Sequence, residues 1–468
     1  MYRLNKIGKI KTRTASEIAT SKLGIGFEKL DRDAFNPEKA YDKMSKIGVK
    51  WVRIQSGWQK TEKIKGVYDF AWLDSIVDNI IARDMTPWMC VCYGNRIYGG
   101  MAEEVLGAVG CPPIHTEEQR SAWDNYCRAL AEHFNGRVKH FEVWNEPDGI
   151  HCWKHGLCPE EVGLFNIATA KALKSGNPDA YIIGGALGAI NMPFIDGLFK
   201  TGMLDYVDAI SFHAYTYDDT KISHGIRALR AASDMYNPKI EIIQGESGAQ
   251  SRPLGNGALR EGAWTPKKQC KAMLRHLVTD LGMGCIMSSY FSCMDMIEAL
   301  KGKVGDVGSY KDFAYFGVLG AEFDENGVAI GEYPPKPSYY ALSNLASLLH
   351  GDVKAMDLPI TVRSDLAKHL GNIPSLESCE IEYYGFRLDN GSFAYAYWHP
   401  SSFMTGDFEG AVTFGPADLG KIHLVDPMDG NIYELSEQMT VKNERGEDEL
   451  KLLPVRDYPL FLVFGEMD

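Results

Sequence analysis

The chain has 468 residues, 45% of them hydrophobic and 24% charged, a composition typical of a globular protein with a buried core. Its length exceeds one ordinary domain and favours a large domain with a smaller one. A net charge of −13 without a Lys/Arg cluster argues against nucleic acid and membrane surfaces as partners, because phosphate groups require a basic face.

Residues 1–21 contain Lys and Arg but no apolar signal region, and no apolar stretch reaches the roughly 18 residues of a membrane span. Of the ten cysteines, Cys90, Cys92, Cys285 and Cys293 lie in or beside apolar strands, where cysteine is usually a buried hydrophobe. We therefore expect a reduced, cytoplasmic protein, or a secreted one if a leader has been removed. The sequence leaves open whether the protein is a monomer or a homo-oligomer.

From residue 23 onward, strand-like runs alternate with amphipathic helical runs, the pattern of repeated βα units. A final helix is expected at about Pro337 to Leu349. The sequence predicts an α/β fold, a (β/α)8 TIM barrel over residues 22–350. Its eight predicted strands are Leu23–Phe27, Trp51–Gln55, Thr86–Tyr93, Lys139–Trp144, Tyr181–Gly185, Ala209–His213, Ile240–Gly245 and Cys285–Phe291.

After Gly351, short strand patterns separated by turn residues predict a C-terminal β-sandwich over residues 351–468. Asp389-Asn390-Gly391 and Asp429-Gly430-Asn431 are hairpin signals. Residues 1–21 are a candidate for one more strand of the sandwich. The predicted strands are Ile360–Val362, Cys379–Leu388, Ser392–His399, Ala411–Phe414, Ile422–Asp426 and Leu460–Gly465.

Two strand ends carry glutamates. The alternating run His140 to Trp144 ends in Asn145 and Glu146, and Pro147 stops the ladder because it has no N–H. A second apolar strand closes on Glu246, 100 residues later, or about three βα units of roughly 30 residues. Taken alone, Glu146 could be a surface charge at a strand-to-loop junction. Two carboxylates projecting over one barrel mouth, however, are what glycosidic bond hydrolysis requires.

These motifs resemble clan A of the glycoside hydrolases, and family 39 most closely. Tyr68-Asp69-Phe70 and Met85-Thr86-Pro87-Trp88 add to a similarity that covers residues 22–350. The resemblance implies that Glu146 is the acid/base after strand four and that Glu246 is the nucleophile ending strand seven. The segment Gln244 to Gly248 departs from the Thr-Glu-Tyr or Thr-Glu-Phe usual in the family, which leaves the substrate open.

Other candidates fall at strand ends, where a barrel of this type places its chemistry. Arg53 in a buried strand resembles the strand-two arginine that would keep Glu246 ionised, although a structural ion pair is the alternative. His213 and Tyr215 share a strand face, and the resemblance implies that such a donor orients the nucleophile. A core histidine is the rival interpretation. We expect Glu146 itself to have a raised pKa from burial and from its like-charged partner.

Sugar binding is expected of further polar and aromatic residues, because aromatic rings complement the C–H faces of sugars. Any of them could instead be ordinary packing, and Glu28 and Asp31 could bind sugar hydroxyls or be solvated loop charges. The candidates are Asn145, Trp58, Tyr93, Asn95, Trp153, Tyr290 and Phe291.

The loop from His151 to Cys158 holds four soft ligands, but their spacing matches no common zinc pattern. We expect no metal and no cofactor, and a loop that shapes the site. The sequence thus predicts a retaining glycoside hydrolase of short oligosaccharides or glycosides, an exo-β-glycosidase such as a β-xylosidase. Arabinosidase, β-glucosidase, β-galactosidase and endo-glycosidase specificities are alternatives, as are a non-catalytic carbohydrate-binding barrel and a metal-dependent hydrolase.

Overall fold

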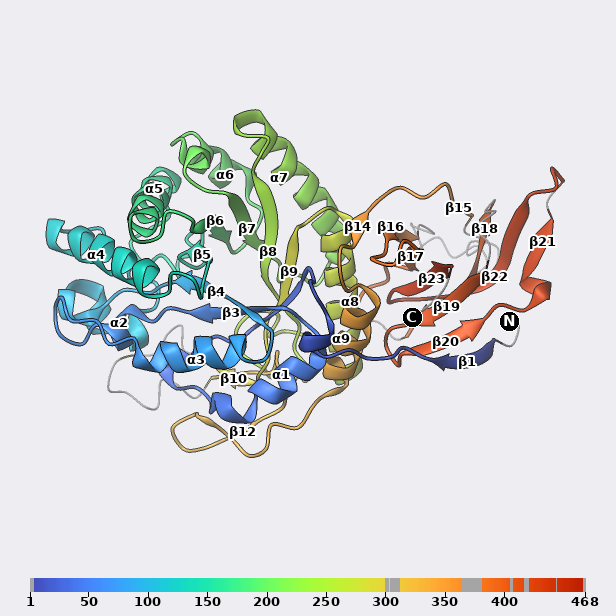
Figure 1. The fold of residues 1–468 in the computed structure, drawn as a ribbon, viewed down its shortest axis with the longest axis horizontal. Helices are drawn as coiled ribbons and strands as arrows, with labels where there is room; N and C mark the ends of the chain where they lie inside the picture. Colours follow the sequence, from blue (N-terminus) through green and yellow to red (C-terminus); the bar gives the residue numbers. More distant parts are fainter. Residues whose placement is uncertain are drawn as a thin grey trace.

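The computed structural model describes residues 4–298, 303, 312–363, 381–404, 407–415, 421–442 and 444–465. Eight parallel strands close into a barrel and confirm the predicted TIM-barrel fold (Figure 1). The strands are β2 (Leu23–Gly26), β3 (Trp51–Gln55), β4 (Thr86–Val91), β5 (His140–Val143), β6 (Tyr181–Leu187), β7 (Ala209–His213), β8 (Glu241–Ser247) and β9 (Met287–Tyr290). Each lies within two residues of a predicted strand at both ends.

Helices surround this barrel, and their sequences explain where they begin. The side chain of Thr116 caps the first turn of α4, and Thr265 followed by Pro266 begins α8 in the same way. The helices are α1 (Tyr41–Ile47), α2 (Trp58–Thr61), α3 (Ala71–Ile81), α4 (Glu117–His133), α5 (Pro159–Gly176), α6 (Met192–Phe199), α7 (Ile222–Tyr236), α8 (Pro266–Gly282) and α9 (Pro337–Leu348).

The C-terminal strands form two antiparallel sheets, which confirms the predicted β-sandwich (Figure 1). One sheet has the order β1-β20-β19-β23-β17-β16-β14 and the other β15-β18-β22-β21. Their bounds are β1 (Asn5–Lys9), β14 (Lys354–Ala355), β15 (Thr361–Arg363), β16 (Glu382–Arg387), β17 (Phe393–Trp398), β18 (Glu409–Gly415), β19 (Ile422–Asp426), β20 (Asn431–Glu434), β21 (Thr440–Lys442), β22 (Asp448–Arg456) and β23 (Leu460–Phe464).

The core of the sandwich is aromatic. Phe414 of β18 packs edge-on against Tyr397 and Tyr395 of β17, with ring centroids 4.7 and 5.6 Å apart. The Tyr397 hydroxyl donates to the carbonyl of Pro454 in β22 and so ties the two sheets together. The start of the predicted strand at Cys379 lies outside the described residues. β22 is a strand that the sequence analysis missed, because its charges and Pro454 obscure the alternation.

Helix α8 lies between the barrel and the sandwich, and every residue from Gln269 to Leu281 is buried. Arg275 donates to the backbone carbonyl of Ser401, and Lys271 forms an ion pair with Asp457, both partners belonging to the C-terminal sheets and their loops. Four short strands, β10 (Met296–Ile297), β11 (Phe313–Ala314), β12 (Glu322–Phe323) and β13 (Ala329–Ile330), form two two-stranded antiparallel sheets. No helix within the described ranges is long and apolar enough to span a membrane.

Candidate active site

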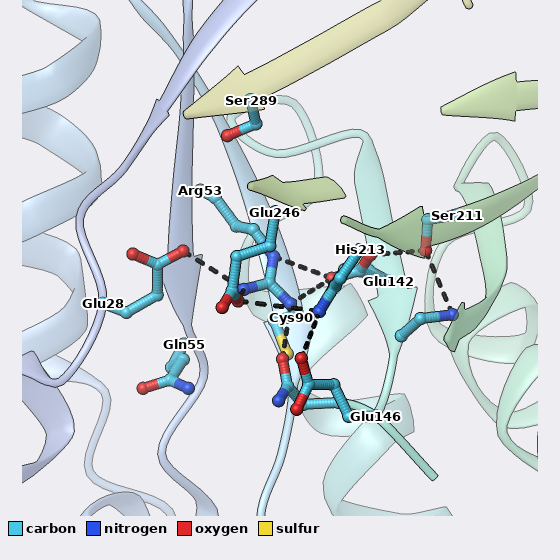
Figure 2. Close-up of polar contacts among 12 residues, drawn as sticks. Glu28, Arg53, Gln55, Cys90, Glu142, Glu146, Ser211, His213, Glu246 and Ser289 are labelled. Carbon is cyan, nitrogen blue, oxygen red and sulfur yellow. Dashed lines mark hydrogen bonds and ion pairs between the residues drawn. The ribbon is translucent and has the colours of Figure 1, made fainter. Parts of the chain in front are cut away.

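A cavity of about 590 Å³ opens at the carboxyl ends of the barrel strands. Glu146 and Glu246 both line it, although they lie 100 residues apart in the sequence. Of the residues singled out from the sequence, the cavity is also lined by Glu28, Tyr93, Asn145, Tyr215 and Phe291. Figure 2 shows the carboxyl groups of Glu146, Glu246 and Glu28 gathered around the guanidinium group of Arg53.

The backbone that carries Glu146 is strained. Trp144 and Glu146 have φ angles of 65° and 47°, a left-handed conformation that costs a non-glycine residue roughly 1–3 kcal/mol. Two contacts hold it there: the Glu146 N–H donates to the carbonyl of Ala186 at 2.7 Å, and the Trp144 indole donates to the carbonyl of Cys152 at 2.7 Å. Such backbone strain is typical of functional sites, where it fixes the direction of one side chain, here that of Glu146.

Arg53 is the centre of the polar network and is fully buried. Its Nε and Nη2 donate to Glu142 Oε2 at 2.8 and 2.6 Å, and its Nη1 donates to Glu246 Oε2 at 2.7 Å. Nη2 also donates to Asn145 Oδ1 at 2.8 Å. The arginine therefore lies beside both strand ends that carry the glutamates, with a positive charge against Glu246.

His213, the last residue of β7, and Tyr215, just beyond it, contact different glutamates. The Tyr215 hydroxyl donates to Glu246 Oε1 at 2.5 Å. His213 Nδ1 lies 2.9 Å from Glu146 Oε1 and 3.9 Å from Glu246 Oε2. Tyr215 is therefore the closer hydrogen-bond partner of Glu246, and His213 is chiefly the partner of Glu146.

This histidine changes the expected protonation of Glu146. Burial raises the pKa of the Glu146 carboxyl, but the hydrogen bond and charge of His213, together with the charge of Arg53, bring the net pKa below its ordinary value. The expectation of a raised pKa was wrong, because it ignored the imidazole. Burial lowers the pKa of His213, whereas the charges of Glu246 and Glu146 and the hydrogen bond to Glu146 raise it above its ordinary value overall. Both shifts favour a protonated His213 beside an ionised Glu146.

One oxygen of each glutamate and one nitrogen of His213 lie within 4.8 Å of one another. Among the described residues, these three side chains form the group that could ligate a metal ion. The Arg53 guanidinium already places a positive charge against Glu246, and His213 Nδ1 already binds Glu146. A second cation would therefore meet repulsion at this position.

The side chains of the loop from His151 to Cys158 diverge. Cys152 is buried and lies with Sγ 3.7 Å from Glu146 Oε2, on the cavity wall. His155 pairs with Glu161, and Cys158 contacts Glu160. Only the first half of the loop, through His151 and Cys152, shapes the cavity.

Four predicted sugar contacts require correction, because these side chains face the protein interior and not the cavity. Trp58 is fully buried, donates to Glu62 at 2.5 Å and stacks on Tyr98. Asn95 donates to the backbone of Glu62, Trp153 packs edge-on against Trp144, and the Tyr290 hydroxyl donates to the carbonyl of Phe316.

Some residues of the site were not predicted from the sequence. Glu142 is fully buried and accepts hydrogen bonds from Arg53 and, at 2.6 Å, from Ser211. A charge in the middle of an apolar strand was its signal, the same signal that identified Arg53. Gly245 permits its position, because a Cβ there would lie 2.8 Å from Glu142 Oε1. Further cavity residues that the sequence did not single out are Lys29, Arg32, Gln55, Tyr217, Glu298 and Asp312.

Comparisons with known proteins agree with this geometry. The model of glycosyl hydrolases family 39 matches residues 28–358. The chain is 27% identical over 222 residues to a beta-xylosidase of Geobacillus stearothermophilus, a match that covers 42% of each protein. It is 29% identical over 149 residues to the beta-galactosidase BgaA of Clostridium cellulovorans, covering 28% of this chain and 22% of that protein. The matched segments thus span less than half of either curated relative.

Solved structures share the fold. A family 39 glycoside hydrolase from Bacteroides cellulosilyticus superposes with a TM-score of 0.64 at 18% identity, covering 95% of this chain and 81% of the other. A monomeric beta-xylosidase from Caulobacter crescentus gives a TM-score of 0.59 at 15% identity, covering 98% and 97%. The closed barrel with two strand-end glutamates at one mouth is the architecture of clan A. Because the family match covers more than half of the chain, this protein belongs to glycosyl hydrolases family 39.

Proposed function

We propose that the protein hydrolyses β-glycosidic bonds with retention of configuration, with Glu246 as nucleophile and Glu146 as acid/base. The observation that carries the proposal is the separation of the two carboxyl groups, which have oxygens within 4.8 Å of one another. Retaining enzymes hold these groups about 5–5.5 Å apart, whereas inverting enzymes need roughly 6.5–9.5 Å for an intervening water.

The contacts of each carboxyl group suit its proposed duty. Arg53 and Tyr215 both donate to Glu246, which fixes the direction of its carboxyl group for attack on the anomeric carbon. The bond to the leaving oxygen breaks as Glu146 supplies a proton. That proton comes from the Glu146–His213 pair and moves along the hydrogen bond between Nδ1 and Oε1. Glu146 then takes a proton from water, which releases the sugar from Glu246.

For the substrate, we propose a short β-xyloside cleaved from its end, with β-galactosides as the second choice. The support is the beta-xylosidase of Geobacillus stearothermophilus and the beta-galactosidase of Clostridium cellulovorans among the relatives. A panel of 4-nitrophenyl β-glycosides decides between these two sugars. Absence of turnover on every member of the panel would instead favour a non-catalytic carbohydrate-binding barrel.

Azide rescue tests the two roles. On an aryl glycoside with a good leaving group, Glu146→Ala should form the glycosyl-enzyme but release it slowly, because no base activates water. Added azide should restore turnover and give the β-glycosyl azide. Glu246→Gly should give negligible turnover without azide, and azide entering the space left by the carboxylate should give the α-glycosyl azide in a single displacement. Glu62→Gln, a change at a buried glutamate outside the cavity, serves as control and should show no response to azide. An α-azide from Glu146→Ala would mean exchanged roles or inversion.

A further inference from the structure

A third carboxyl group, that of Glu28, lies beside the proposed nucleophile. Glu28 follows β2, lines the cavity and is only 1% exposed. Its Oε1 accepts from Arg53 Nη1 at 3.1 Å, and the same nitrogen donates to Glu246 Oε2 at 2.7 Å. The two carboxyl groups are thus neighbours on one guanidinium nitrogen, and Figure 2 shows Glu28 on the opposite side of Glu246 from Glu146.

The second oxygen of Glu28 has an unused capacity for hydrogen bonding. Oε2 is buried and has no hydrogen-bond partner among the described residues. Buried polar atoms are rarely left without a partner, and each such atom calls for an explanation. The chain makes room for this atom, because a Cβ on Gly26 would lie 2.2 Å from Oε2.

Holding Arg53 does not explain Glu28. Glu142 already accepts two hydrogen bonds from the guanidinium group, and Glu246 accepts a third. Glu28 adds another buried acid to a group with one permanent cation. Burial raises its pKa to about 7, the charge of Arg53 opposes this, and the charge of Glu246 adds to it. Near neutral pH the carboxyl group can therefore either accept or donate a hydrogen bond.

We propose that Glu28 binds a hydroxyl group of the sugar ring that lies over Glu246 and thereby determines which sugar the site accepts. This inference rests on the proposed function. A hydroxyl group both donates and accepts, which matches a carboxyl group whose second oxygen is unpartnered. A ring with its anomeric carbon at Glu246 carries hydroxyl groups on the neighbouring carbons, within reach of the adjacent carboxyl group. A ring lacking that hydroxyl would leave the buried Oε2 of Glu28 without a hydrogen bond.

The test pairs changes in the protein with changes in the substrate. The parent 4-nitrophenyl glycoside, chosen as the one that the wild-type protein hydrolyses fastest, is compared with its monodeoxy analogues. The wild-type protein should lose about 100-fold or more in kcat/KM on the analogue that lacks the bound hydroxyl. In Glu28→Met, which keeps the side-chain length but cannot hydrogen-bond, the same deletion should cost less than about tenfold. Glu28→Gln should restore much of the discrimination.

A merely structural Glu28 would give a different result, because its loss would slow the parent and every deoxy analogue by one common factor. An unchanged ratio in Glu28→Met overturns the inference. If that variant does not fold, a crystal structure of the wild-type protein with the product monosaccharide decides, and a Glu28 carboxyl group that contacts no sugar oxygen overturns it. Glu62→Gln is the matched buried control, with an unchanged ratio expected. If the wild-type protein hydrolyses no glycoside, the proposed function fails first and separately.

Discussion

The protein contains two buried networks of charged side chains, and they differ in how their charges balance. In the network between α8 and the sandwich, each buried cation has a buried acid as its partner. Arg275 binds Asp219 through Nε at 2.6 Å and also through Nη2. Lys271 binds Asp457 in a pair of which both side chains are at most 3% exposed. The network joins parts of the chain that are distant in sequence.

The network at the barrel mouth has more acids than cations. Arg53 pairs with Glu28, Glu142 and Glu246, and His213 is the second basic side chain, beside Glu146 and Glu246. Four acids thus face two basic groups, and one oxygen of Glu28 has no hydrogen-bond partner among the described residues. Buried charges are costly unless they are paired, so an excess of acid is not what stability alone would select. A buried network with equal numbers of acids and cations thus stabilises the fold. A network with excess acid beside a cavity indicates a ligand or a reaction.

The largest effect should come from removing one acid of the unbalanced network. Glu246→Gln should lower kcat on an activated aryl glycoside by about 10⁴-fold or more, because no carboxylate remains to form the covalent intermediate. The melting temperature should stay the same or rise, since Arg53 keeps Glu142 and Glu28. Steady-state kinetics and calorimetry on the same sample measure both. A clearly lower melting temperature would show that Glu246 serves the fold.

The balanced network should give the opposite result. Arg275→Met leaves Asp219 buried without its cation and should lower the free energy of unfolding by about 3–5 kcal/mol. The kcat of the folded protein should change less than about twofold, because Arg275 does not reach the cavity. Denaturant titration and steady-state kinetics test this. Lys267→Met is the matched control, because Lys267 and Asp407 are more than half exposed and their pair should contribute less than about 1 kcal/mol.

The sequence was most informative about the barrel, because buried parallel strands are short apolar runs with sharp ends. For this reason the sequence predicted β5 with Glu146 shortly after its end, and β8 with Glu246 near its end. β22 was missed because Pro454 and its charged residues hide the alternation, while pairing with β18 overrides that local signal. A strand that is held mainly by its neighbours cannot be recognised from its own residues.

Proximity to a strand end did not tell which way a side chain points. Trp58 follows β3 closely, yet its ring turns into the core against Tyr98 and Trp123. The pairing of His213 with Glu146 could not be predicted from the sequence either, because the register between β7 and β8 shifts at His213 and a regular strand pattern does not foresee this. Residue types predicted which residues belong to the site, but the backbone geometry determines which of them bind each other.

The raised pKa of His213 beside Glu146 predicts the alkaline side of the pH profile. The proton must be present for the leaving group to depart, and the pKa of His213 lies above its ordinary value of 6.5. The kcat/KM should therefore stay high as the pH rises past 6.5 and fall only beyond it. In His213→Asn the decline should begin at lower pH, with kcat reduced about tenfold or more at neutral pH. A wild-type decline that is complete by pH 6 would contradict a raised pKa of His213.

The smallest effect concerns Asp280, a buried acid on α8 that has no cation partner within the described part of the chain. Ser288 donates to its Oδ2 at 2.7 Å, and burial raises its pKa from 3.8 to about 7. A pKa that is higher in the folded state means that its contribution to stability is complete below about pH 4 and is lost as the pH rises through 7. Asp280→Asn cannot ionise, so it should gain stability relative to the wild-type protein by about 1–2 kcal/mol more at pH 8 than at pH 5. Denaturant titrations at the two pH values measure this difference. An equal difference at both would show that Asp280 is ionised throughout and that its environment is less apolar than its burial implies.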